Sequence, residues 1–171
     1  GLMAGSWLMR RQGRRQEGVV LSTLGIGIAA ASSWLGGELA YDLGIGVDHA
    51  AFEKPPTDWT DVAALDDLTD GEPKRVEADG TPVMLLRQGE RIRAIGATCP
   101  HLGGPLDKGA IEGDTVACPW HGSVFRLDDG ALRHGPATMP VAAYEARVTN
   151  GRVEIRANAT RAGGMIGASM L

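Results

Sequence analysis

The chain lacks most of the features that mark an enzyme or a nucleic-acid binder. Its 171 residues include only two cysteines and four histidines, and the formal net charge is −4. No phosphate-cradling glycine loop, Ser/His/Asp set, internal repeat or basic patch occurs, so nothing supports nucleotide binding, triad hydrolysis or nucleic-acid recognition. Residues 57–158 carry sixteen acidic and eleven basic side chains. This balance argues against polyanionic partners and allows a basic protein partner.

Both cysteines and two of the histidines lie in two short clusters. The first cluster holds Cys99 and His101. After sixteen intervening residues, the second holds Cys118 and His121. Each cluster offers one thiolate and one imidazole, which is the donor set of a Rieske-type [2Fe–2S] centre. A zinc finger instead pairs its cysteines at one end and its histidines at the other. A zinc-binding structural module with the same four donors is the alternative, because four such ligands suit tetrahedral Zn²⁺.

The residues around these donors resemble the two cluster-binding loops of Rieske proteins. The first is CPHLGGPL at 99–106, and the second is CPWHGS at 118–123. A third segment, GPATMP at 135–140, is similar to the proline-bearing loop that covers the cluster in that family. The resemblance extends over about residues 57–158.

The resemblance implies a ligand assignment. Cys99 and Cys118 would bind the inner iron, and His101 and His121 the outer, more exposed iron. The expected surroundings of the cluster come from all three loops: Leu102, Gly103, Gly104, Trp120, Gly122, Ser123, Phe125, Gly135 and Pro136. The glycines that follow the ligands allow the backbone to approach a cluster without a Cβ clash.

Departures from one branch of the family indicate a ferredoxin-like, disulfide-free subtype. Quinol-oxidising Rieske proteins carry a further, disulfide-forming cysteine in each loop, where this chain has Gly104 and Trp120. They also carry a tyrosine that donates to a cysteine sulfur, where this chain has Phe125. Ser123 can still donate its hydroxyl. Because hydrogen bonds to the sulfurs raise the potential, we expect a value in the lower half of the Rieske range of about −150 to +300 mV.

Short β-rich runs separated by turn signals predict an all-β fold, a Rieske-type antiparallel sandwich or barrel with a cluster-binding subdomain. The runs at 83–87 and 91–95 flank Gln-Gly-Glu. The runs at 141–148 and 152–156 flank an Asn-Gly pair, the strongest short hairpin signal. Charged and apolar residues alternate over 152–156, which predicts one solvated and one buried face.

The first fifty residues have a different composition. Residues 19–35 carry no charge and have the minimum length that can span a bilayer. Small residues in this run suit helix–helix packing in membranes. Arginines precede the run and acidic residues follow it, which places the arginines in the cytoplasm and the Rieske domain outside. The absence of disulfides favours the opposite, cytoplasmic face.

Two accounts of this region compete. Arg14 and Arg15 before the apolar run resemble a twin-arginine signal anchor. Alternatively, residues 34–47 resemble the end of an uncharacterised bacterial multi-pass membrane domain, to which the Rieske domain would be fused. The expected organisation is a basic juxtamembrane segment or tail of an upstream helix at 1–18, a transmembrane helix at 19–40, a linker at 41–56, a Rieske [2Fe–2S] domain at 57–158 and a mobile tail at 159–171.

These features predict a membrane-tethered one-electron carrier that passes electrons between redox partners, with the bilayer contacted through residues 19–40. The partner would be a redox protein or a membrane redox complex, with a quinone as a further candidate. The alternative is the ferredoxin component or electron-transfer subunit of a Rieske-type dioxygenase or quinol-oxidising complex. An oxygenase in its own right would need a second iron site, and only His49 and His134 are left to build one. The intact donor set argues against a cluster-less regulatory module.

Overall fold

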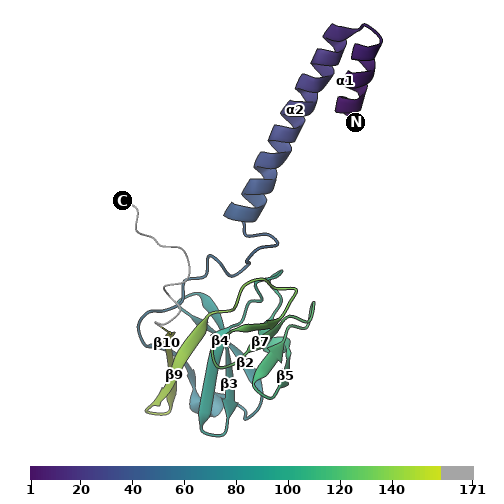
Figure 1. The fold of residues 1–171 in the computed structure, drawn as a ribbon. Helices are drawn as coiled ribbons and strands as arrows, with labels where there is room; N and C mark the ends of the chain where they lie inside the picture. Colours follow the sequence, from purple (N-terminus) through teal and green to yellow (C-terminus); the bar gives the residue numbers. More distant parts are fainter. Residues whose placement is uncertain (159–171) are drawn as a thin grey trace. The chain divides into compact units, whose positions relative to one another are not determined.

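The computed structural model of the protein describes residues 1–158, so the tail expected at 159–171 lies outside the described residues. The chain divides into two compact units, Gly1–Gly44 and a second unit that begins at Ile45. The first is helical and the second is built from β-strands (Figure 1).

The helical unit is a hairpin of two antiparallel helices. Its elements are α1 (Leu2–Arg11), α2 (Arg15–Gly37) and a π-helical turn, η1 (Glu38–Asp42). Gly13 makes the turn between the helices with a φ of 81°. The Ser6 hydroxyl donates to the carbonyl oxygen of Gly18 at 2.5 Å. A Cβ on Gly18 would lie 2.8 Å from the Ser6 carbonyl oxygen, so the glycine permits the close approach of the two helices.

One helical stretch in the described part of the chain, Arg15–Asp42, is long and apolar enough to cross a membrane. It has 28 residues, which exceeds the number that a bilayer core requires. The ten-residue α1 is too short for this. The multi-pass organisation expected from residues 34–47 is not found within residues 1–158, which hold one candidate span.

The β unit contains two antiparallel sheets, which confirms the predicted all-β fold (Figure 1). The six-stranded sheet has the order β1-β10-β9-β4-β3-β2, with β1 (Thr60–Ala64), β2 (Pro73–Ala78), β3 (Thr81–Gln88), β4 (Arg91–Gly96), β9 (Ala143–Thr149) and β10 (Arg152–Ala157). The four-stranded sheet has the order β5-β6-β7-β8, with β5 (Ala110–Glu112), β6 (Thr115–Ala117), β7 (Val124–Arg126) and β8 (Leu132–His134). Two short 3₁₀ turns are η2 (Leu65–Asp67) and η3 (Leu106–Lys108).

The hairpin signals of the sequence account for the strand connections. Gly89 turns β3 into β4 with a φ of 64°. Asn150 and Gly151, with φ of 52° and 74°, turn β9 into β10. Positive φ at both central residues matches the twist of the paired strands, which is why Asn-Gly is favoured here. Val153 and Ile155 of β10 are fully buried, as the alternation predicts.

Strand β3 lies between two hydrophobic clusters because its side chains alternate between the faces of the sheet. Val83 and Leu85 belong to the cluster on one face. Met84 and Leu86 belong to the cluster on the other face. That second cluster also contains both cysteines of the chain, together with residues of the small sheet. The core thus fixes the positions of the two thiols.

The segment expected as a linker is hydrogen-bonded to the β unit over its second half. The Thr81 hydroxyl donates to the carbonyl of Lys54 at 2.8 Å. The Ala157 amide donates to the carbonyl of Pro56 at 2.7 Å. These bonds hold residues 54–56 against β3 and β10, so this part of the segment belongs to the β unit.

Candidate metal centre

The first cysteine–histidine loop follows β4 and ends at η3. Its backbone closes on itself through two hydrogen bonds. The Cys99 amide donates to the carbonyl of Gly104 at 2.8 Å, and the Gly103 amide donates to the carbonyl of Cys99 at 2.9 Å. Gly103 has a φ of 77°, a left-handed conformation that glycine adopts without strain.

The second loop, between β6 and β7, repeats this geometry. The Cys118 amide donates to the carbonyl of Ser123 at 2.8 Å, and the Gly122 amide donates to the carbonyl of Cys118 at 3.0 Å. Gly122 has a φ of 75°. Two loops of the same shape therefore face each other, and each presents one cysteine and one histidine.

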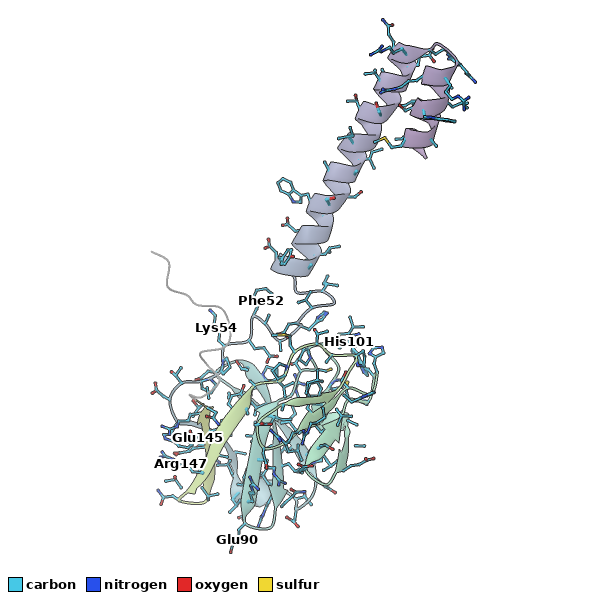
Figure 2. All side chains as sticks on the ribbon, in the orientation of Figure 1. Phe52, Lys54, Glu90, His101, Glu145 and Arg147 are labelled. Atoms are coloured by element: carbon cyan, nitrogen blue, oxygen red, sulfur yellow. The ribbon has the colours of Figure 1, made fainter. Side chains whose placement is uncertain are left out.

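The two histidines meet at the outer end of the site, where Figure 2 labels His101. The ring centroids of His101 and His121 are 4.8 Å apart, with the planes at 89°. His121 is exposed, whereas the Nδ1 atom of His101 is buried. This nitrogen has no hydrogen-bond partner among the described residues. A buried polar atom without a partner is costly, and bonding to a metal would satisfy it.

The two cysteines form the inner end of the site. Cys99 is 1% exposed and Cys118 is 4% exposed. Burial raises the pKa of the Cys99 thiol, while the backbone amide of His101 and the Ser123 hydroxyl oppose the shift by hydrogen bonding. Since a metal binds the thiolate, loading of the site must displace this proton.

The arrangement of the donors fits a binuclear cluster better than a single ion. Within residues 1–158, no group of three or more His, Cys, Asp or Glu side chains is placed to hold one metal ion. Tetrahedral zinc would need all four donors around one point. A Rieske cluster needs only two protein ligands at each iron, with two cysteines on one and two histidines on the other. The buried thiols, the paired imidazoles and the unpartnered Nδ1 of His101 fit that requirement.

Gly104 allows the two loops to pack closely. A Cβ at this position would lie 2.7 Å from the Sγ of Cys118 and 3.3 Å from the ring of Trp120. The first distance is shorter than real Cβ contacts allow, and the sulfur is buried. This site therefore has no room for any side chain at position 104.

The third loop is tied to the second by a serine. Ser123 is fully buried, and its Oγ accepts a hydrogen bond from the Ala137 amide at 2.9 Å. Because the oxygen is the acceptor there, the hydroxyl hydrogen is free to bond elsewhere, and it interacts with the Cys99 sulfur. Gly135 and Pro136 form the start of this loop through a cis peptide bond.

Replacement of Ser123 by alanine is expected to lower the reduction potential, since one hydrogen bond to sulfur is lost. Losing the acceptor for Ala137 should also destabilise the protein by about 1–3 kcal/mol, because a buried amide is left unpaired. Redox titration and thermal unfolding measure the two effects. Thr115→Ala, which removes an exposed hydroxyl, is the control. A potential equal to that of the control would contradict the assigned role.

The other predicted neighbours divide into a buried and an exposed group. Phe125 is fully buried in the cluster of side chains that holds both cysteines, and it offers no donor. Leu102 and Trp120, which adjoin His101 and His121 in the sequence, are exposed to 40% and 56%. Met139 of the third loop, which was not predicted as a neighbour, is exposed to 37%.

Sequence reasoning missed one segment that contacts this site. The His49 amide donates to the carbonyl of Pro100 at 2.9 Å, so His49 lies against the first loop. No local signal marks this contact, because fifty residues separate the partners. His134 is exposed at the end of β8.

Comparison with known proteins gives a family match over the β unit. The model of the Rieske [2Fe-2S] domain matches residues 58–145. Ferredoxin CarAc of Metapseudomonas resinovorans is 33% identical over 98 residues, which are 57% of this chain and 92% of that protein. Apoptosis-inducing factor 3 of Mus musculus is 33% identical over 97 residues, but the match spans only 16% of that protein and 57% of this chain.

Solved structures give the same result. The ferredoxin of carbazole 1,9a-dioxygenase from Nocardioides aromaticivorans IC177 is 31% identical, with a TM-score of 0.55 over 60% of this chain and 100% of that one. A ferredoxin–oxygenase complex of carbazole 1,9a-dioxygenase contains a chain that is 32% identical, with a TM-score of 0.53 over 57% of this chain and 92% of that one. The chain therefore belongs to the Rieske [2Fe-2S] domain family, is homologous to dioxygenase ferredoxins, and has a Rieske [2Fe–2S] cluster as its cofactor.

Proposed function

We propose that Cys99, Cys118, His101 and His121 hold the cluster and that the protein is a ferredoxin-type carrier of single electrons. The observation that carries the proposal is how burial changes across the two ligand loops. Both thiols are buried in the core, whereas the two imidazoles lie together towards the surface. When bound, a Rieske cluster supplies reversible one-electron chemistry.

Other functions at the site would be performed by the chain's own residues: excluding water, binding the cluster and holding the third loop. The cysteines exclude water from the inner side because they lie in the hydrophobic core. Each histidine would use one ring nitrogen as a ligand and direct the other outward, towards a partner. The buried, unpartnered Nδ1 of His101 supports that atom as the ligand of its ring. Ser123 would hold the third loop over the site and donate to sulfur.

The partner is best sought among oxygenase components. One matching structure is a complex of reduced oxygenase and oxidised ferredoxin in carbazole 1,9a-dioxygenase, which supports this choice by homology. The three exposed apolar side chains on the loops, Leu102, Trp120 and Met139, suit a small docking patch around the histidines. Apolar and aromatic anchors at the centre of an interface contribute most of its binding energy. A membrane redox complex or a quinone is the second candidate, and the apolar helix α2 favours it.

The α2 helix would tether the carrier to a membrane, with its arginine-bearing end on the cytoplasmic side and the β unit on the other. The full chain is then expected to stay in the membrane fraction after an alkaline carbonate wash.

The side of the membrane can be tested with a new thiol. Glu90→Cys introduces an exposed thiol in the β3–β4 turn, while both native thiols are buried. A membrane-impermeant maleimide should label this variant in intact cells. Labelling only after lysis would place the β unit on the cytoplasmic face instead.

The decisive experiment is electron paramagnetic resonance (EPR) of the reduced full chain, with iron and sulfide quantified. Mixed histidine and cysteine ligation gives a lower average g value than ligation by four cysteines. We expect the lower value, together with about two irons and two sulfides per chain, as a [2Fe–2S] cluster requires. Zinc without sulfide would refute the proposed function.

A further inference from the structure

Residues 47–53 lie on the same end of the β unit as the metal centre. Figure 2 labels Phe52 and His101 at this end, and Glu90 at the opposite end. The segment precedes residues 58–145, the region that the family model matches. Here it is called the strap.

The strap brackets the first cysteine. On one side of Cys99, burial raises the pKa of the Glu53 carboxyl, and the neighbouring Thr98 side chain opposes this shift. On the other side, the His49 amide donates to the carbonyl of Pro100 at 2.9 Å. Pro100 is the residue between the two proposed ligands of the first loop. Its peptide is therefore held in place by a segment about fifty residues away in sequence.

The strap also reaches the third loop. The Thr138 hydroxyl donates to the carbonyl of Val47 at 3.3 Å. The strap thus connects the first and third loops, which have no other tie to each other among the hydrogen bonds described above. The curve of the strap is set by Asp48, a buried residue whose Oδ1 accepts from the Ala50 amide at 2.8 Å. An aspartate bonded to the backbone two residues on is a common way to shape a turn.

The imidazole of His49 lies near the first loop. Its Nδ1 lies 3.9 Å from the position of a Cβ on Gly103, the residue that closes the first loop. Its Nε2 is buried and has no hydrogen-bond partner within residues 1–158. A ring that only filled space would carry this unsatisfied nitrogen at a cost in stability. Because of this cost, we infer that the imidazole of His49 has a role that an apolar side chain could not perform.

We propose that the strap is a fourth segment of the cluster site and that His49 is its positioning residue. It holds the first ligand loop against the third and restricts access of solvent to the cluster. This inference rests on the proposed function, because it assigns a role towards the same cluster. Positioning groups of this kind are bonded to the residues that carry the ligands, and their loss commonly costs 10–100-fold in metal affinity.

The test compares His49→Ala, His49→Gln and Thr138→Val with His134→Ala, the matched control at an exposed histidine outside the site. The readouts on the full chain are the EPR spectrum and the rate at which an iron chelator bleaches the reduced cluster. Circular dichroism reports the fold. We expect His49→Ala to lose its cluster about tenfold faster than wild type and to shift the g values. His49→Gln should restore part of the resistance to cluster loss and reverse part of the shift in g values, since its amide restores polar contacts. Thr138→Val should act in the same direction with a smaller effect.

The outcomes separate the two proposals. A wild-type chain without a Rieske signal refutes the proposed function, whatever the variants do. A wild-type chain with that signal, whose His49→Ala and Thr138→Val variants bleach at the control rate with unchanged g values, refutes the strap alone. If His49→Ala does not fold, Thr138→Val decides, because it removes only an exposed hydroxyl and keeps nearly the same volume.

Discussion

His121→Ala is expected to abolish the Rieske EPR signal and to remove iron and sulfide from the purified protein. By the proposed assignment, the variant would leave the outer iron with one protein ligand, His101, and would expose that iron to water. His121 is already at the surface, so its loss removes little packing from the core. The β unit should therefore stay folded by circular dichroism while the cluster is lost. Iron analysis and the EPR of the reduced chain measure the effect.

His134→Ala is the matched control for this prediction. His134 is exposed on β8, and it belongs to the same small sheet that leads into the second loop. The control should keep wild-type iron, sulfide and g values. Equal cluster content in His121→Ala and His134→Ala would show that His121 is not a ligand.

Gly104→Ala is expected to lower both the cluster content and the melting temperature. The new methyl group would lie 2.7 Å from the Cys118 sulfur, and that sulfur cannot retreat because it is packed in the core. Overpacking of this kind costs about 1–3 kcal/mol. In a domain of about one hundred residues, each kcal/mol corresponds to about 4–8 °C in melting temperature. Calorimetry of the loaded protein and iron quantification provide the measurement.

Gly96→Ala provides the same chemical change where there is room. Gly96 ends β4, directly before the first loop, and a Cβ there would make only ordinary contacts, the nearest at 3.6 Å. We expect this variant to keep its cluster and to melt near the wild-type temperature. If Gly104→Ala matched it in both respects, the close approach of the two loops would be irrelevant to the site.

The sequence predicts the β unit well because its signals are local. Hairpins depend on two or three adjacent residues, and Asn150-Gly151 takes the positive φ values that the turn needs. The alternation along β10 corresponds to one buried and one solvated face. The donor clusters are equally local, since each spans three or four residues. Their placement on two facing loops follows once the family is recognised.

The sequence does not predict contacts between distant segments. The strap contains no repeat or periodic pattern, and its contacts with Thr98, Pro100 and Thr138 exist only because the chain folds back. The residues before Val19 were expected as a juxtamembrane segment or the tail of an upstream helix. In the structure, α1 forms a hairpin with α2, with Gly18 at the close contact.

By itself, the sequence indicated the chemistry of this protein: four donors in two mixed pairs form the ligand set of a Rieske cluster and leave zinc as the alternative, because ligand type and spacing decide which metal a site prefers. It also determined the all-β fold and the apolar helix, since turn residues and hydrophobic runs act locally. Only the tertiary structure decided that the two thiols are buried and the two imidazoles meet at 4.8 Å. It alone revealed that Gly104 has no space for a side chain and that residues 47–53 lie over the first loop. Burial and long-range contact depend on the packing of the whole chain, and no short stretch of residues specifies them.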